Sequence, residues 1–431
     1  MARTLFTNVS ILDCSGANPY AGEVLVEGNR IKQVAKAKAG GKEKSGLSRD
    51  GARVVDGGGA TLMPGLIESH SHMTFADTST LEALGFIPPE EHLLISVRNA
   101  KTMLDQGFTS ANSAASARPR FDVVLRNAIN AGEIPGPRSL AASPELTVTG
   151  GLGDVNLAHM ERSTFAIVCD GADHFRRVAR EMCREGVDTL KINPSGDEFV
   201  PYARANQTVM TEAEVQAVCE VGHQRGKRIA THARSAESVK LSLRHGCQII
   251  YHATLIDEEA ADLLEAKKDE IFVSPTLGVT YTTSYEAGDW GVTTDIAASL
   301  GLLRELEVGV ENMKKLKKRG VRVLPGGDYG FAWNPVGRNA RDLEHFVKLL
   351  GFTPMEAIVA GTRQAAGIMM MEKELGQIKA GYLADILLVD GNPLSDVRIL
   401  QDRDRLLAIM KDGSFHKDWP GERKSARVAA E

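Results

Sequence analysis

Cysteines are few in this sequence, and they are scattered. Its five cysteines, Cys14, Cys169, Cys183, Cys219 and Cys247, include no Cys-x-x-Cys pair. An odd number of dispersed thiols argues against a disulfide framework and against a cysteine-based zinc site. The same pattern fits a reducing compartment, so we expect a cytoplasmic protein.

Long apolar runs and a basic charge bias are also lacking. No stretch is apolar for the roughly 20 residues that cross a bilayer, and the first residues do not form a signal peptide. Lys and Arg number 51 against 56 Asp and Glu, which gives a net charge of -5. This balance argues against nucleic acid or a membrane as partner. The rest of the composition, 43% hydrophobic and 25% charged residues, is normal for a globular α/β enzyme.

Strand-like and helix-like segments alternate through the middle of the chain, which is typical of a parallel sheet or barrel. One strand-like segment carries His70, and seven more lie at 108–112, 138–142, 186–191, 228–232, 248–252, 271–275 and 321–324. Helix starts are marked by a capping box at Thr211 and by a cap with a following proline at Thr353. Eight such units predict an α/β fold, a (β/α)₈ TIM barrel, over residues 61–368.

Short β segments occur at both ends of the chain. Before the barrel they lie at 5–9, 22–26, 29–34 and 52–56, and after it at 384–389 and 406–410. The first set is too small to bury a core alone. We therefore predict one small β-sandwich domain built from residues 1–60 plus 369–431, with the barrel inserted between its two parts. Residues 36–50, rich in Lys, Gly and Ala, are expected to form an exposed loop.

Two histidines, His70 and His72, close the first predicted barrel strand. Residues i and i+2 of a strand project from the same face, so both imidazoles can aim at one point beyond the strand end. Imidazole nitrogen is a good ligand for zinc and other transition metals. A His-x-His pair also occurs by chance, so the rest of the chain decides between a metal site and two packing residues.

Three further polar residues end other predicted strands, Lys191, His232 and His252, and Asp328 follows the eighth strand. In a barrel, this end of the strands is where active sites form. Each residue also has a structural alternative, namely an ion-paired lysine, a hydrogen-bonded core histidine, a helix cap and a turn aspartate. All of them at one rim favour a functional site. Tyr251 alternates with His252 and is expected to face the helices.

A pair of divalent metals suits these side chains. Two metals about 3.5–4 Å apart need bridging anions and several neutral nitrogens. Burial lowers the pKa of a lysine, and the free amine can add CO₂ to give a carbamate with one oxygen for each metal. The ligands that we expect are His70, His72 and Asp328 for one metal, His232 and His252 for the other, and carboxylated Lys191 for both. Zinc is the expected metal.

This arrangement predicts a hydrolytic reaction. A hydroxide bridging the two metals would be a nucleophile at neutral pH, because metal-bound water has a strongly lowered pKa. Asp328, close to that hydroxide, can accept its proton as general base and pass it to the leaving nitrogen as general acid. One metal would polarise the scissile carbonyl.

The segment Pro64–His72 resembles the opening motif of the amidohydrolase superfamily, and the ordered ligand set is similar to its binuclear, carboxylated-lysine subtype. The segments Ala131–Arg138 and Gly381–Ile386 resemble its imidazolonepropionase-like and prolidase-like branch. Within that branch the chain is similar to bacterial amidohydrolases that cleave ochratoxin A, a phenylalanine amide, and to Xaa-Pro dipeptidases. The resemblance implies a metal-dependent hydrolase of a small-molecule amide or dipeptide, assembled as a homo-oligomer.

Two departures from the pattern of this branch concern the substrate. Where the branch often has His-Ala-His-Gly, this chain has Arg234 two residues after His232. Arg234 either offers a cation to a substrate carboxylate or forms an ion pair with a loop acid. The histidine often found at Leu152 is missing, and His159 in the following loop is a second candidate for substrate binding.

The leading hypothesis is hydrolysis of an amide whose leaving group bears a carboxylate, such as a dipeptide or an N-acyl amino acid. The alternative within hydrolases is opening of a cyclic amide, as in imidazolonepropionase. A Schiff-base aldolase using Lys191 belongs to another class, although the rim histidines would have no purpose there. A metal-binding scaffold without catalysis is the remaining option.

Overall fold

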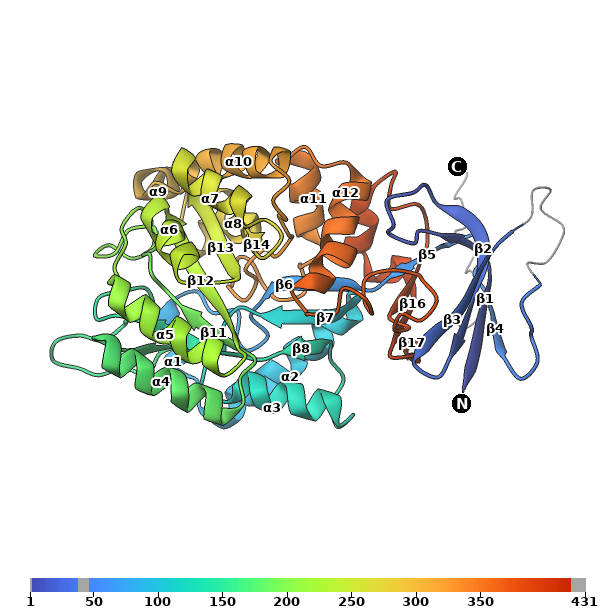
Figure 1. Ribbon diagram of the computed structural model, residues 1–431, viewed down its shortest axis with the longest axis horizontal. Helices are drawn as coiled ribbons and strands as arrows, with labels where there is room; N and C mark the ends of the chain where they lie inside the picture. The colour runs from blue at the N-terminus through green and yellow to red at the C-terminus, as the bar shows by residue number, and fades with distance from the viewer. Residues whose placement is uncertain (1, 38–45, 420–431) are drawn as a thin grey trace.

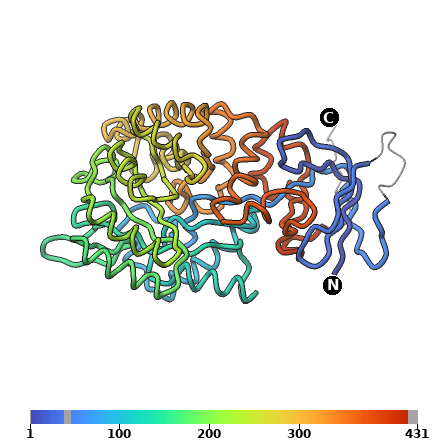
Figure 2. Tube along the Cα trace, viewed as in Figure 1, coloured from blue at the N-terminus to red at the C-terminus, as the bar shows by residue number. Residues whose placement is uncertain are grey.

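The computed structural model describes residues 2–37 and 46–419, which form a larger and a smaller lobe (Figure 1). The middle of the chain makes the larger lobe. Segments from both ends of the chain lie together in the smaller lobe, as the tube in Figure 2 also shows. Within the described ranges, no helix is both long and apolar enough to cross a bilayer.

The smaller lobe is one mixed sheet of eight strands. They are β1 (Arg3–Ile11), β2 (Tyr20–Glu27), β3 (Arg30–Lys36), β4 (Arg53–Asp56), β5 (Thr61–Pro64), β15 (Ile386–Val389), β16 (Leu406–Lys411) and β17 (Ser414–Lys417). Their order is β17-β16-β15-β5-β1-β2-β3, with β4 paired to β1. The sheet has its own apolar core, to which Phe6, Ile386 and Trp419 contribute.

This sheet brings the two ends of the chain together, as the sequence led us to expect, but it continues past residue 60 through β5. The exact domain boundaries stay a prediction. Of the predicted loop at 36–50, residues 46–50 are exposed or half-buried, and residues 38–45 lie outside the described part of the chain.

The larger lobe contains the barrel strands. They are β6 (Leu66–Ser71), β7 (Phe108–Ser113), β8 (Arg138–Leu140), β9 (Ala142–Thr147), β11 (Thr189–Ile192), β12 (Arg228–Ser235), β13 (Ile249–Leu255) and β14 (Phe272–Ser274), with β10 (Ala166–Val168) beside β9. All neighbouring pairs are parallel, in the orders β6-β7-β8 and β10-β9-β11-β12-β13-β14.

Two further observations account for all eight strands of the barrel. β8 and β9 are successive parts of the third strand, with β8 bonded to β7 and β9 bonded to β11. The eighth position is the segment 321–324, which joins β14 through a bridge between Val273 and Val323. Gly326 then packs against His70 so closely that a Cβ there would lie 2.8 Å from the His70 nitrogen. The predicted α/β fold, a TIM barrel with a small β domain formed by both chain termini, is confirmed; the domain predicted as a β-sandwich has its strands in one mixed sheet.

Twelve α-helices occur in the described part of the chain. They are α1 (Leu81–Phe86), α2 (Pro89–Asp105), α3 (Phe121–Asn130), α4 (Ala172–Glu185), α5 (Glu212–Gln224), α6 (Ala236–Arg244), α7 (Glu258–Ala266), α8 (Leu277–Tyr285), α9 (Thr294–Leu300), α10 (Leu302–Lys318), α11 (Arg341–Lys348) and α12 (Pro354–Val359). The predicted capping box at Thr211 is present, because Glu214 accepts a hydrogen bond from the Thr211 nitrogen. Thr353 likewise caps α12, with Pro354 at its first position.

Arg138 connects the two lobes at the bottom of the barrel. Its guanidinium pairs with Asp385, which is buried, and with Asp412 at the end of β16. Replacing Arg138 by Ala would leave Asp385 without its partner, so we expect the free energy of unfolding to fall by about 3 kcal/mol. Chemical denaturation would measure this. Arg398→Ala, which removes an exposed pair with Asp396, is the control and should change stability little.

Candidate metal centre and active site

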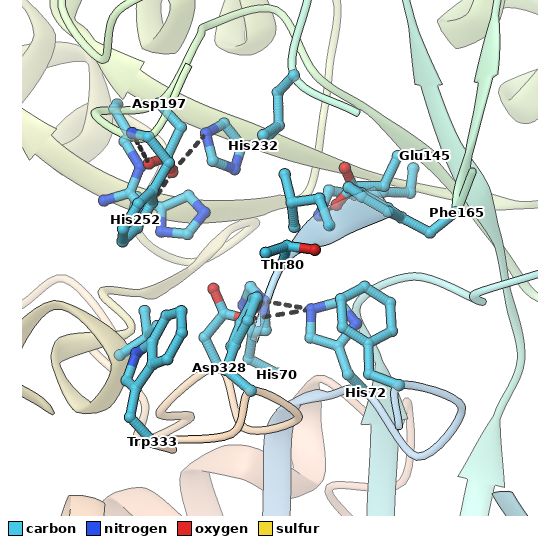
Figure 3. A pocket seen from close by; sticks show the side chains of 18 of the residues that line it. His70, His72, Thr80, Glu145, Phe165, Asp197, His232, His252, Asp328 and Trp333 are labelled. Atoms are coloured by element: carbon cyan, nitrogen blue, oxygen red, sulfur yellow. Dashed lines mark hydrogen bonds and ion pairs between the residues drawn. The ribbon is translucent and has the colours of Figure 1, made fainter. Parts of the chain in front are cut away.

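His70, His72 and Asp328 meet at the end of β6 (Figure 3). The two Nε2 atoms lie 3.1 Å apart. Asp328 Oδ1 lies 3.4 Å from Nε2 of His70 and 3.1 Å from Nε2 of His72. All three side chains are buried, so three ligand atoms converge where little water reaches.

Hydrogen bonding fixes which nitrogen of His72 can bind a cation. Its Nδ1 lies 3.2 Å from the carbonyl oxygen of Ala115, so we place the ring proton there. Nε2 then carries a lone pair and faces the Asp328 carboxylate, which is also an acceptor. Burial lowers the pKa of His70 to about 3, so that ring is neutral. Two imidazoles and one carboxylate form the donor set of a divalent metal site.

His232 and His252 form a second pair across the cavity (Figure 3). Their ring centroids are 4.1 Å apart, and the centroid of His252 is 5.7 Å from that of His70. Burial, followed by the positive charge of Arg234, lowers both pKa values well below the ordinary range. His232 Nε2 is 3.0 Å from the Gly196 oxygen and His252 Nδ1 is 2.6 Å from Thr276 Oγ1, so each ring keeps one nitrogen free for a metal.

Lys191 lines the same cavity from β11 and is fully buried. Its Nζ lies 3.3 Å from Glu145 Oε1 and 4.9 Å from the centre of the Tyr251 ring. Strand pairing places Lys191 directly opposite Glu145. The ion-pair alternative for Lys191 is therefore present, and the lysine also lies among the predicted ligands.

Backbone conformation at His252 explains a wrong prediction. His252 and Ala253 have φ values of 72° and 52°, in the left-handed region that side chains rarely adopt. This bulge breaks the alternation of the strand, so Tyr251 also points inward. Its hydroxyl accepts a hydrogen bond from Asn112 at 2.9 Å, and its ring centroid lies 4.1 Å from that of His70. Tyr251 packs against the candidate ligand His70 instead of facing the helices.

The same strained conformation recurs at two other points of the rim. Thr276, the hydrogen-bond partner of His252, has φ 56°, and Asp328 has φ 58°. The Asp328 turn is held by Asn334, which donates to the carbonyl oxygens of Gly327 at 2.9 Å and Asp328 at 3.0 Å. Such conformations cost energy and cluster at functional sites, where the surrounding structure enforces them.

The six residues open into a cavity of about 280 Å³. Its upper wall is mostly apolar. The side chains that form this wall are Phe75, Leu81, Leu152, Phe165, Phe199, Val279, Phe331 and Trp333. The Phe75 ring stacks on His72 at 4.0 Å between centroids, so the apolar wall reaches the metal-binding residues directly.

The two predicted substrate-binding residues lie in different places. Arg234 lines the cavity and is buried, but it pairs with Asp197 in the loop after β11 and with Glu305 on α10. An ion pair with a loop acid was one of the two roles expected for it. His159 is exposed in the loop between β9 and β10 and does not line the cavity.

The sequence reasoning missed the three acids around these cations. Glu145 lies in the buried strand β9, and a charged residue in a barrel strand is the signal that could have found it. Asp197 follows Lys191 by only six positions in the chain, in a loop that carries no motif. Glu305 lies on helix α10, and nothing in the sequence of that helix indicates that Glu305 contacts Arg234.

Comparison with known proteins agrees with this site. The amidohydrolase family profile matches residues 61–415. Ochratoxinase from Aspergillus niger is 25% identical over 376 residues, 83% of this chain and 75% of its own. Imidazolonepropionase from Rubrobacter xylanophilus is 26% identical over 388 residues, 85% of this chain and 84% of its own. A solved prolidase complexed with N-methylphosphonate-L-proline has a TM-score of 0.85 at 26% identity, covering 96% of this chain and 100% of that chain.

These findings confirm the resemblance seen in the motifs. The matched region contains all six predicted ligands, and the family is metal-dependent, in keeping with the His70, His72 and Asp328 group. The chain belongs to the amidohydrolase family and is an enzyme, a hydrolase that acts on carbon–nitrogen bonds.

Proposed function

We propose that this enzyme hydrolyses the amide bond of a small molecule with the help of two divalent metals, expected to be zinc. The observation that carries the proposal is the convergence of His70, His72 and Asp328, with ligand atoms 3.1–3.4 Å apart, inside a buried cavity. The neighbouring pair of neutral imidazoles and the buried lysine supply what a second metal needs.

The residues assigned to the two metals follow from their positions. His70, His72 and Asp328 would hold one metal and His232 and His252 the other, and a carboxylated Lys191 would be a further ligand. When bound, the metals supply a hydroxide at neutral pH and polarise the scissile carbonyl. Carboxylation turns the Lys191 cation into an anion, so its ion pair with Glu145 is given up. The Glu145 carboxylate keeps a partner, because Asn193 donates to its other oxygen at 2.5 Å.

Asp328 is the residue that moves protons in this proposal. Its carboxylate lies beside the Nε2 atoms of His70 and His72, and the left-handed backbone conformation of Asp328 holds it there. It accepts the proton of the attacking water and delivers it to the nitrogen of the leaving group. The aromatic wall above the site excludes water from the reacting bond, since Phe75 covers His72.

The relatives support two substrate types. Ochratoxinase and prolidase point to an acyclic amide, which we favour, and imidazolonepropionase points to a cyclic one. The substrate carboxylate predicted from the sequence needs a cation to bind it. Arg234 is the residue that was expected to supply this cation. The homo-oligomer and the cytoplasmic location remain predictions.

Metal analysis combined with an amide-hydrolysis screen tests the proposal. The panel contains N-acyl amino acids, uncharged N-acyl amines and lactams. We expect about two metal ions per chain and turnover of acyclic amides. Turnover of lactams alone would favour the cyclic alternative, and loss of activity after borohydride treatment with substrate would favour a Schiff-base aldolase. No turnover of any amide by metal-loaded protein would contradict the proposal.

A further inference from the structure

The cavity contains two cationic side chains, and each is already neutralised by acids. Arg234 is buried between two carboxylates, with Nη1 2.5 Å from Glu305 Oε1 and Nη2 2.8 Å from Asp197 Oδ2. Lys191 is paired with Glu145 at 3.3 Å. Carboxylation of Lys191 would remove that positive charge altogether. Neither residue is a free cation for a substrate.

Arg234 is not available by rearrangement either. Glu305 is 1% exposed, and its Oε1 also accepts a hydrogen bond from Thr254 at 2.6 Å, so it cannot turn to solvent. Moving the guanidinium toward a ligand would leave a buried carboxylate unpaired, which is costly. A substrate carboxylate at Arg234 would therefore be the third negative charge around one positive charge.

The apolar side chains that make up most of the remaining lining favour an apolar ligand. Phe331 and Trp333 stack with their centroids 5.8 Å apart, and Phe165 packs on Phe75 at 5.5 Å. Leu152 occupies the position at which the branch often has a histidine, and it contributes an aliphatic side chain to the same cavity. Aromatic and aliphatic walls bind uncharged rings and chains well, and they penalise a charge that finds no partner.

We propose that the substrate is an uncharged amide with an aromatic-sized apolar group and no carboxylate on its leaving amine. The cluster of Arg234, Asp197 and Glu305 is then the specificity element that rejects acidic leaving groups. This inference rests on the proposed amide hydrolysis and replaces the carboxylate-bearing leaving group that the sequence suggested.

Two compounds that differ only in the carboxylate test this directly. N-benzoyl-L-phenylalanine and N-benzoylphenethylamine share both rings and the scissile bond. We expect the metal-loaded enzyme to cleave the uncharged compound with a kcat/KM higher by about tenfold or more, because a carboxylate on the leaving amine would meet an arginine already paired with two acids. Equal or faster cleavage of the acid would overturn the inference.

Asp197→Asn identifies the residues responsible. It removes one of the two acids around Arg234 and should shift the preference toward the acid by about tenfold. Glu82→Gln is the matched control, because it removes a negative charge from the cavity lining away from Arg234. A shift of equal size in both variants would contradict the role of the cluster. Thermal unfolding verifies that each variant is folded.

Binding to the metal-stripped full-length chain separates this inference from the proposed function. Calorimetric titration with the same two compounds should give tighter binding of the uncharged one by about tenfold. Tighter binding of the acid would contradict the inference alone. Preferential binding of the uncharged compound, with no cleavage of either compound by the metal-loaded enzyme, would contradict the proposed hydrolysis alone.

Discussion

Stripping the metals with a chelator is expected to abolish amide hydrolysis. The activity should fall by about 10³-fold or more, because metal ions stabilise the charge of the transition state by several kcal/mol. The ligand atoms of His70, His72 and Asp328 face one another at 3.1–3.4 Å inside the cavity, where the metal would supply this contribution. The measurement is the initial rate on an amide substrate, together with the metal content of the same sample.

Recovery should require more than the metal. Zinc with bicarbonate is expected to restore the rate, whereas zinc in CO₂-free buffer should restore it more slowly, because Lys191 must first be carboxylated. Circular dichroism before and after stripping is the control for folding. Full activity in metal-free protein would refute the proposed chemistry, and recovery that is independent of bicarbonate would refute the carbamate.

Asp328→Asn is expected to lower kcat by about 10²- to 10⁴-fold, the range over which general acid–base groups contribute. The amide has the same shape as the carboxylate and keeps one oxygen toward His70 and His72. It cannot accept the proton of the attacking water. The turnover number and the bound metal are to be measured on the same preparation.

The control for this substitution is Asp289→Asn, which makes the same chemical change at an exposed position of the loop before α9. It should leave kcat unaltered. If the Asp328 variant retained wild-type turnover with its metals in place, Asp328 would only be a ligand. If neither protein cleaved any amide while both bound metal, the scaffold hypothesis would stand.

The positions of the six candidate ligands could be predicted because each lies in the C-terminal part of a barrel strand or just beyond it. Strand periodicity puts His70 and His72 on one face, and the parallel arrangement brings the ends of distant strands to one rim. The capping boxes at Thr211 and Thr353 could be predicted for a similar reason, since they depend only on residues three positions apart.

Features that depend on distant contacts could not be predicted. The bulge at His252 contains no glycine that would indicate a left-handed backbone conformation. Strict strand alternation was therefore assumed, and Tyr251 was assigned to the wrong face of the strand. The two acids that neutralise Arg234 come from a loop and from α10, and no sequence spacing links them to β12. Both roles of Arg234 therefore stayed open in the sequence, although the location of that side chain in the cavity was anticipated.

A single residue, Gly65, separates strand β5 of the terminal sheet from strand β6, which carries His70. A Cβ at Gly65 would lie 2.1 Å from Thr109 Oγ1, so the crossing is too tight for any larger residue. The Gly65 nitrogen donates to the Asp385 carbonyl oxygen at 2.9 Å, and β15 continues along β5 from there. The small lobe thus fixes the position of the start of strand β6. Deleting β15 to shorten the enzyme is therefore expected to disturb first the positions of His70 and His72.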